Sequence, residues 1–378
     1  MALKILHILS GLGQGGIEKW LVNLTAELHR RHGTEVECGF LTLLEPDGYY
    51  RAKLESMDCK VSHCQLAWRH LPSFIHRLST RLRPGRYDVV HCHADYLSGL
   101  VLPVARAVGV RTRIAHVHTT QFAFQARKPL ARYLVGRLLR RLSASQASSC
   151  VGCSQAALDS YLGELQRKVP HVICACGIPF AGYREAVSLG RGEIRQSLNW
   201  PEGTGVVLHV GRHSKAKNLF YLLGIFAGMV RHNPDLLCVL AGAGPLTNEL
   251  LGRASELGIS EKVRFLGIRE DVPRLMRAAD LLLFPSLYEG LGLVLIEAQA
   301  VGLRSLVSNI VPSEVQLVEG LVHRLPLSRP PEAWTEAALQ LLKRPLPDAK
   351  ACLGNVESSP FNIRHSAESL MALYSRTK

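Results

Sequence analysis

The sequence predicts an α/β protein built from two doubly wound, Rossmann-like domains, because three observations agree. Apolar strand-like runs alternate with runs that carry apolar residues at helical spacing, which is typical of a parallel sheet covered on both faces. This alternation occurs twice, and it is more regular after residue 205. A length of 378 residues, 47% apolar and 20% charged, fits two globular domains, and no charge-free segment is long enough to cross a membrane.

The first series starts with a strand expected over residues 4–10. A glycine loop at 11–16 and a helix at 17–31 follow it. The start of the chain does not resemble a secretory signal, because it has one Lys, a short apolar run and no cleavage pattern. The remaining expected elements are a helix at 95–109 and strands at 35–43, 87–93, 111–120, 148–154 and 171–177.

The second series reads strand, helix, strand with short loops between the elements. Its strands are expected at 205–211, 236–242, 262–267, 280–286 and 304–309, and its helices at 218–233, 246–258, 271–279 and from near Leu291. The segment 177–204 contains several Gly and Pro residues and is the expected linker. We therefore expect an N-terminal domain over 1–180, a C-terminal domain over 181–355, and a final helix in 356–378 that packs back on the first domain.

The formal charge of +14 lies mainly in the first part of the chain, where residues 1–150 hold 21 Lys and Arg against 10 Asp and Glu. The densest basic segment is 127–142, which has no acidic residue and interleaves leucines with its arginines. That composition suits a helix on anionic lipid headgroups, and a solvated helix with one basic face is the alternative. We expect no nucleic-acid partner, since no binding module accompanies the charge.

Ten scattered cysteines favour reduced thiols in a cytoplasmic protein that is large enough to fold without disulfides. The pairs Cys150/Cys153 and Cys174/Cys176 have a spacing that zinc could use. However, both pairs lie in apolar, strand-like stretches where cysteine acts as a small hydrophobe, and the histidines at 91–93 are interpreted in the same way. The sequence therefore predicts no metal site.

Ligands of doubly wound sheets bind beyond the carboxyl ends of the strands, so the loops after the strands are searched for chemistry. Arg212 and Lys217 follow a central strand of the second domain, where a guanidinium and an ammonium could hold a diphosphate. Ordinary surface basic residues are the alternative. The glycine turn at 241–246 would let the backbone approach a ligand.

Two carboxylates, Glu289 and Glu297, stand in an otherwise apolar stretch. If the helix begins near Leu291, the free N–H groups of Leu291, Gly292 and Leu293 form an anion site that suits a phosphate. Carboxylates bind sugar hydroxyls, so Glu297 suits a ribose and Glu289 a transferred sugar. The alternative, a Glu297 side chain that faces water, is difficult on a segment this apolar.

A sugar-transfer family is suggested by these residues together with further motifs. The stretch 289–300, EGLGLVLIEAQA, resembles the signature of the family 4 retaining glycosyltransferases of the GT-B fold. The donor domain of that family is also similar to four further segments of this chain: VGRHSKAKN, AGAGPL, FLGIREDVPRLMRAADLLLFPSLYEG and SNIVPSEV. The first half resembles the acceptor domain of the bacterial exopolysaccharide and capsule branch, through ILHILSGLGQGGIEK and VVHCHADYLSGLVLPVARAVGVRTRIAHVHTT.

The resemblance implies two domains that face each other across a cleft, and a UDP- or GDP-sugar donor held mainly by the second domain. Arg212 and Lys217 match the basic pair that offsets the leaving diphosphate, Glu297 matches the ribose ligand, and Glu289 matches the carboxylate near the donor sugar. From the first domain, the backbone of Gly15 and Gly16 matches the loop that approaches the phosphates. His118 matches the histidine that faces the donor sugar, with His116 as the competitor.

The expected activity is a retaining hexosyl transfer to a lipid-linked oligosaccharide in cell-surface polysaccharide synthesis. The basic first domain would place the enzyme on the inner, cytoplasmic face of an anionic membrane. No D-x-D motif is present, so we expect neither a metal nor another cofactor. The alternatives are transfer to a soluble small-molecule acceptor, and a non-catalytic GT-B binding subunit.

Overall fold

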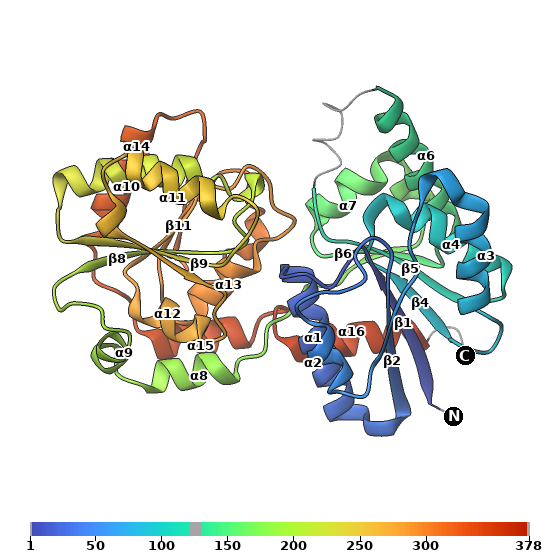
Figure 1. The fold of residues 1–378 in the computed structure, drawn as a ribbon. Helices are drawn as coiled ribbons and strands as arrows, with labels where there is room; N and C mark the ends of the chain where they lie inside the picture. The colour runs from blue at the N-terminus through green and yellow to red at the C-terminus, as the bar shows by residue number, and fades with distance from the viewer. Residues whose placement is uncertain (1, 121–129, 376–378) are drawn as a thin grey trace. The chain divides into compact units, whose positions relative to one another are not determined.

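The computed structural model describes residues 2–120 and 130–375, which form two compact units. The first unit comprises Met1–Gly177 and Ile363–Lys378, and the second comprises Ile178–Asn362. Each unit contains one parallel sheet with helices on both faces (Figure 1). The expected class, two doubly wound α/β domains, is confirmed.

The first unit has a seven-stranded sheet in the order β3-β2-β1-β4-β5-β6-β7. The central strand β1 is buried along almost its whole length, as the apolar run in its sequence predicts. Residue His7 of β1 pairs in register with His91 of β4. The strands are β1 Leu3–Leu9, β2 Val36–Thr42, β3 Lys60–His63, β4 Val89–Cys92, β5 Thr112–Val117, β6 Ser149–Gly152 and β7 His171–Ile173.

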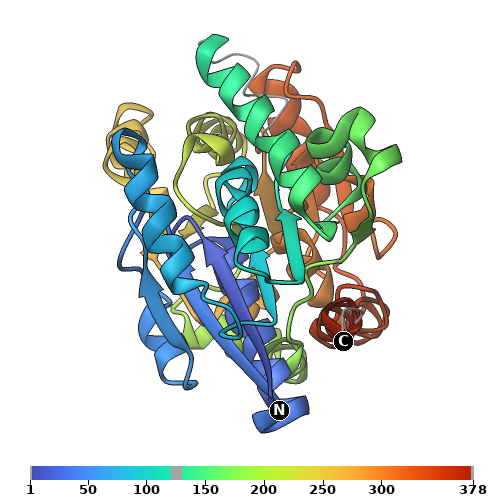
Figure 2. The same ribbon diagram turned by 90° about the vertical axis from the view of Figure 1, so that its right-hand side faces the viewer.

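Helices cover both faces of this sheet (Figures 1 and 2). The last helix of the chain, α16, belongs to this unit and packs against α1, as expected for the C-terminal helix. The helices are α1 Gly16–His32, α2 Arg51–Glu55, α3 Leu71–Arg81, α4 Ser98–Ala107, α6 Leu130–Gln146, α7 Gln155–Leu162 and α16 Ile363–Ser375.

The second unit has a six-stranded parallel sheet in the order β10-β9-β8-β11-β12-β13. The order reverses between β8 and β11, so the loops that follow these two strands lie at the switch point where such sheets bind ligands. The strands are β8 Gly205–Val210, β9 Leu236–Ala241, β10 Val263–Gly267, β11 Leu281–Phe284, β12 Ser305–Ser308 and β13 Val322–Leu325.

The main core of the second unit lies between this sheet and the helices α10, α11 and α14. Trp334 of α14 is fully buried there and packs with Phe226 of α10 and other apolar side chains. The helices are α8 Ala181–Ser188, α9 Arg191–Ser197, α10 Leu219–His232, α11 Thr247–Glu256, α12 Val272–Ala278, α13 Leu293–Ala300, α14 Pro331–Leu342 and α15 Ala349–Glu357.

The prediction that residues 177–204 form a linker is wrong for most of that segment. Helices α8 and α9 occupy it and pack on α12. Tyr183 and Ile194 are buried, and the guanidinium groups of Arg191 and Arg195 both bind the carboxylate of Asp280. The Gly and Pro residues separate two short helices instead of marking an open connection.

Within residues 2–120 and 130–375, no helix is both long enough and apolar enough to cross a bilayer.

Candidate active site

The loop after β8 carries Arg212 and Lys217 and is held against the loop after β9. The N–H of Gly211 donates to the carbonyl of Ala241 (3.0 Å), and the N–H of His213 donates to the carbonyl of Ala243 (3.0 Å). A Cβ atom at Gly242 would lie 2.0 Å from the carbonyl oxygen of Gly211, so only glycine permits this approach. The backbone of the two loops is therefore fixed at the carboxyl edge of the sheet.

Lys217 and Glu289 form an ion pair at this edge. Nζ of Lys217 lies 2.6 Å from Oε1 of Glu289 and 4.7 Å from the centre of the Phe284 ring, and both charged side chains are mostly buried. The loops that carry them are tied together, because the N–H of Leu287 donates to the carbonyl of Ala216 (2.7 Å). The sequence identified both residues but did not pair them.

Arg212 lies in the same loop, and its residue is exposed. Among the described residues, no acidic side chain forms an ion pair with its guanidinium. Lys217 therefore already has a carboxylate partner, whereas Arg212 is available to an anion.

Helix α13 begins at Leu293, two residues later than the expected start at Leu291. Gly292 stands before it in the left-handed conformation (φ 85°), which a helix cannot include and which glycine adopts without strain. The N–H of Leu295 donates to the carbonyl of Gly292 (2.9 Å). The start of the helix is thus at Leu293 and Val294, and the predicted anion site shifts toward these residues.

Glu297 lies in the middle of α13 and is buried, so the alternative of a side chain facing water is wrong. Tyr183 of α8 is one of its neighbours: burial raises the pKa of the Tyr183 hydroxyl well above its usual value, and the charge of Glu297 and a hydrogen bond to it raise that pKa further. A buried carboxylate that is bonded to a phenol has a fixed position, as a hydroxyl-binding group requires. Nothing in the sequence pointed to Tyr183.

Gly15 and Gly16 lie where the first unit's glycine loop enters α1. Gly15 is the residue before the helix and has extended backbone, and a Cβ atom there would lie 2.1 Å from a carboxylate oxygen of Glu18. A Cβ atom at Gly16 would meet nothing within 4 Å. The backbone at Gly16 is therefore open to approach, and its expected contact with phosphates stays a prediction.

His118 and His116 belong to a buried cluster of five histidines that lie on β1, β4 and β5 or directly after them. His7 pairs in register with His91, and side chains two residues apart point to the same face of a sheet. The five imidazoles therefore share one face. Nε2 of His118 is bonded to Nδ1 of His93 (2.9 Å), whose Nε2 is bonded to Nδ1 of His7 (3.1 Å).

Further partners complete the cluster. Nδ1 of His118 lies 3.6 Å from Sγ of Cys176, and Nδ1 of His91 lies 2.7 Å from the hydroxyl of Tyr374. The ring of Trp20 stands edge-on to the ring of His116 at 5.3 Å. Burial lowers the pKa of His118 to about 3, so its imidazole is neutral. The structure thus places His118 in a buried network, and its expected role at the donor sugar stays a prediction.

The same histidines form two overlapping triads, His7/His91/His93 and His93/His116/His118, with ligand nitrogens within 4.8 Å of one another. Neutral imidazoles could bind a transition metal at such spacing. However, most of these nitrogens already bond one another in pairs. His116 also stacks on His118 with ring centres 3.9 Å apart, whereas imidazoles that share a metal point their nitrogens at one ion. A stacked, hydrogen-bonded network explains the arrangement.

The sequence missed His7, His91 and His93 as partners of His116 and His118. The alternation of histidines at 91 and 93 and at 116 and 118 shows that each pair shares a sheet face, but it does not show which neighbour covers them.

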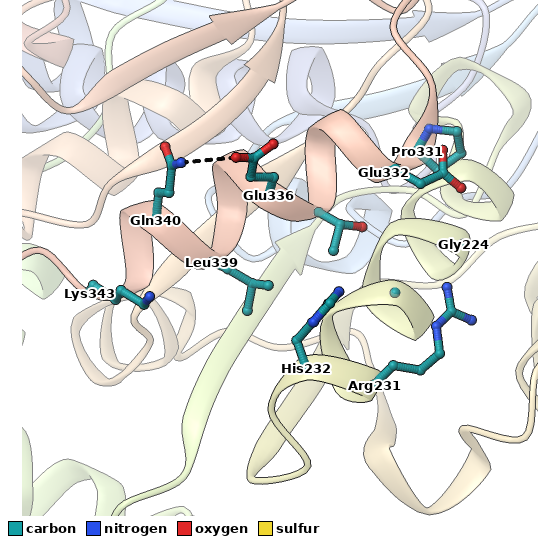
Figure 3. Close-up of a pocket in the computed structure, with 11 residues that line it drawn as sticks. Gly224, Arg231, His232, Pro331, Glu332, Glu336, Leu339, Gln340 and Lys343 are labelled. Atoms are coloured by element: carbon teal, nitrogen blue, oxygen red, sulfur yellow. Dashed lines mark hydrogen bonds between the residues drawn. The ribbon is translucent and has the colours of Figure 1, made fainter.

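Two pockets lie elsewhere in the second unit. One of about 360 Å³ lies between α10 and α14, where Gly224 leaves space beside Arg231 and Lys343 (Figure 3). The amide of Gln340 donates to Glu336 on its wall (3.4 Å). A second, of about 1250 Å³, is lined by residues of α9, the start of β8 and the end of α14. Neither is lined by a residue predicted for the active site.

Comparisons with known proteins agree with this fold. Residues 15–177 match the family described as "Glycosyl transferase 4-like domain", and residues 190–355 match "Glycosyl transferases group 1". A Bacillus subtilis protein named as a glycosyltransferase, EpsF, is 30% identical over 344 residues, which cover 88% of this chain and 86% of EpsF.

Two further proteins are similar. The Escherichia coli UDP-Gal:alpha-D-GlcNAc-diphosphoundecaprenol alpha-1,3-galactosyltransferase is 28% identical over 234 residues, 61% of this chain and 59% of that enzyme. Anabaena Alr3699/HepE, solved in complex with UDP-glucose, has a TM-score of 0.76 at 20% identity, with 99% of each chain covered. Because the domain matches fall on both units and EpsF is similar over most of its length, the chain belongs to the family 4 glycosyltransferases of the GT-B fold.

Proposed function

We propose that this enzyme is a retaining hexosyltransferase that moves a sugar from a UDP- or GDP-sugar to a lipid-linked oligosaccharide in cell-surface polysaccharide synthesis. The observation that carries the proposal is the ion pair of Lys217 and Glu289, which lies with the available cation of Arg212 at the switch point of the second sheet. HepE, which has the same fold, binds UDP-glucose in its crystal structure.

The charges fit the departure of a nucleoside diphosphate. Negative charge grows on the diphosphate as its bond to the sugar breaks, and fixed cations stabilise that charge best in a site that excludes water. Arg212 supplies a fork for two phosphate oxygens, and Lys217 supplies a second positive charge whose position Glu289 fixes. The start of α13 at Leu293 adds backbone N–H groups.

The two carboxylates have separate roles in this proposal. Glu289 accepts a hydrogen bond from a hydroxyl of the donor sugar, and its ion pair with Lys217 holds that ammonium in place. Glu297, fixed by Tyr183, accepts hydrogen bonds from the ribose. The acceptor hydroxyl attacks the sugar carbon from the face that the diphosphate leaves, and its proton passes to a phosphate oxygen. The anomeric configuration is therefore retained without an enzyme nucleophile.

We propose that the transfer needs no metal or other cofactor, because Arg212 and Lys217 supply the positive charge that a bridging cation would supply. Transfer should therefore be unchanged when Mg²⁺ and Mn²⁺ are omitted and EDTA is present. Loss of transfer in EDTA that Mg²⁺ or Mn²⁺ restores would contradict this part of the proposal.

The lipid-linked acceptor is supported by the name of the Escherichia coli relative, which acts on a diphosphoundecaprenol-linked sugar. The basic charge of residues 1–150 supports a peripheral position on the cytoplasmic face of an anionic membrane. Efficient transfer to soluble sugar phosphates, with no preference for a lipid-linked acceptor, would instead favour a soluble substrate.

A thermal-shift screen of nucleotide sugars tests the donor. A donor at one hundred times its dissociation constant should stabilise the protein by about 2.7 kcal/mol, and nucleoside monophosphates should have a smaller effect. Arg212→Ala and Glu289→Ala should each remove transfer while far-UV circular dichroism stays unchanged. If both variants transfer sugar at the native rate, the assigned site is wrong; if the native protein binds a donor but never transfers, it is a binding subunit.

A further inference from the structure

Helix α6 of the first unit carries its large apolar side chains on the outside. Four leucines spaced by four residues share one face of the helix, together with one valine. We call this set the leucine stripe. Its exposed fractions are 71% for Leu130, 51% for Leu134, 59% for Leu138, 37% for Leu142 and 45% for Val135.

The inner face of α6 is built mainly from small residues. Gly136, Ser143 and Ala144 are buried, with Leu139 as the one large apolar side chain among them. The helix approaches α4 so closely that a Cβ atom at Gly99 would lie 2.0 Å from the carbonyl oxygen of Leu139. The contact with the core therefore uses small residues, and the leucine stripe contributes little to the fold.

A continuous row of exposed leucines is unusual on the surface of a globular protein. Single exposed apolar residues are common, whereas contiguous patches mark surfaces that bind a partner or a membrane. Five neighbouring positions on one helix form such a patch.

The charge around the leucine stripe favours one kind of partner. Helix α6 contains four arginines and no acidic residue. Arg132 and Arg141 are exposed, whereas Arg140 turns inward and donates to the carbonyl of Ser160 (3.3 Å). Arg137 lies 5.8 Å from the ring centre of Tyr133. An apolar stripe bordered by arginines matches the acyl region and the phosphates of an anionic lipid leaflet.

We propose that α6 is the membrane-docking element of this enzyme: the leucine stripe enters the headgroup region of an anionic leaflet, and Arg132 and Arg141 bind lipid phosphates beside it. The proposal extends the membrane part of the function proposed above and names the surface responsible. Because the leucine stripe runs along the helix and the opposite face is buried against the unit, the helix, about 25 Å long at 1.5 Å per residue, lies in the plane of the interface.

A second copy of the chain is a less suitable partner for this face. Two copies of α6 placed face to face would bring their arginines together with no acidic residue on either helix to offset them. Lipid phosphates provide that negative charge.

Vesicle sedimentation tests the proposal on the full chain. The probe is vesicles of phosphatidylcholine with and without phosphatidylglycerol. We expect the native protein to sediment with the anionic vesicles. The double variant Leu134→Glu/Leu138→Glu should bind them at least about tenfold more weakly, because both leucines then carry charge into an anionic interface.

A matched control is available in the second unit. Leu251 of α11 is 48% exposed, close to the exposure of Leu134, and lies outside the leucine stripe. Leu251→Glu should bind vesicles like the native protein. Equal binding by Leu134→Glu/Leu138→Glu and native protein would overturn the proposal, as would equal loss in Leu251→Glu.

A fluorescence experiment separates insertion from charge attraction. Brominated lipids in anionic vesicles should quench the tryptophan of Leu138→Trp more than that of Leu251→Trp, each compared with native protein. Equal quenching would show that α6 does not enter the leaflet. Arg132→Glu/Arg141→Glu should weaken binding without moving the emission of the buried tryptophans.

A separate measurement of donor binding distinguishes a failure of this inference from a failure of the proposed function. The α6 variants should bind UDP- or GDP-sugar like the native protein. If the native protein binds a donor but no vesicles, the inference fails and the transferase proposal stands. If it binds vesicles through α6 but no nucleotide sugar, the transferase proposal fails instead. A native dimer that α6 variants dissociate, with no vesicle binding, would identify a second copy as the partner.

Discussion

The two units share a doubly wound fold but use polar side chains on their central strands differently. In the first unit, five histidines are buried, neutral and bonded to one another. In the second, Lys217 and Glu289 are charged and paired at the ends of the strands, with Arg212 exposed beside them. The difference is one of access: the imidazoles of the first unit are enclosed in their own network, whereas the charged groups of the second lie at the edge of the sheet with an exposed cation among them.

The largest expected difference between the two units is in their stability at low pH, which should fall more in the first unit. Burial lowers the pKa of His7 and His118 to about 3 from the ordinary 6.5, and His91, His93 and His116 are also lowered. Below about pH 6.5 these histidines bind protons in the unfolded chain, whereas in the folded chain they stay neutral until the pH is much lower. The free energy of unfolding should therefore fall as pH drops from about 6.5 toward 3, by up to about 1.4 kcal/mol per pH unit for each histidine.

The second unit has fewer such groups: burial lowers the pKa of His209 to about 3 and also lowers those of His213 and His323. Hydrogen exchange at a series of pH values should show β1, β4 and β5 opening at a higher pH than β8 and β11. Simultaneous opening of both sheets would contradict the assigned difference.

The charged pair should act as one catalytic unit. Lys217→Met and Glu289→Gln should each lower the rate of transfer by about 10²–10³-fold, because each leaves its partner misplaced at the diphosphate. The double variant should transfer sugar only slightly more slowly than the less active of the two single variants, because residues that act together have non-additive effects.

The matched control is the exposed pair Arg253 and Glu256, whose charged atoms lie 2.8 Å apart on α11. Arg253→Met and Glu256→Gln should leave the rate nearly unchanged. Fully additive losses at Lys217 and Glu289 would show that the two residues act independently.

His118 decides whether the histidine cluster also touches the donor. If its role is confined to the buried network, His118→Ala should cost about 1–3 kcal/mol of stability by leaving Nδ1 of His93 without its partner, with kcat preserved at low temperature. Loss of kcat with an unchanged melting temperature would instead support the contact with the donor sugar that the family resemblance implies. His116→Ala provides the comparison, since Nδ1 of His116 bonds His91 instead.

Tyr183→Phe should have the smallest effect. It removes one hydrogen bond from the buried carboxylate of Glu297 and should cost about 1–2 kcal/mol of stability with a several-fold weaker affinity for the donor. The predicted outcome is a rise in KM with little change in kcat. A normal KM would show that Tyr183 does not position Glu297 for the ribose.

Much of the fold could be predicted because the buried strands have continuous apolar sequences. Strands β3 and β13 were missed: both are short and pair on one side only, at sheet edges where the apolar signal is weak. Helices α8 and α9 were missed because their few buried residues stand between Gly and Pro.

The charged residues of the candidate site were found from their positions after strands and from the family signature. Their partners were not. The contact of Tyr183 with Glu297 joins residues far apart in the chain, and the pairing of Lys217 with Glu289 depends on the path of two loops. The start of α13 was misplaced because the left-handed conformation of Gly292 cannot be read from an apolar run.

A crystal structure of the enzyme with the nucleoside diphosphate that stabilises it most would test the central claim directly. We expect phosphate oxygens within hydrogen-bond distance of Arg212 and Lys217, beside the first N–H groups of α13, with the ribose against Glu297. A diphosphate bound elsewhere on the chain, with the pair of Lys217 and Glu289 in contact with no ligand, would contradict it.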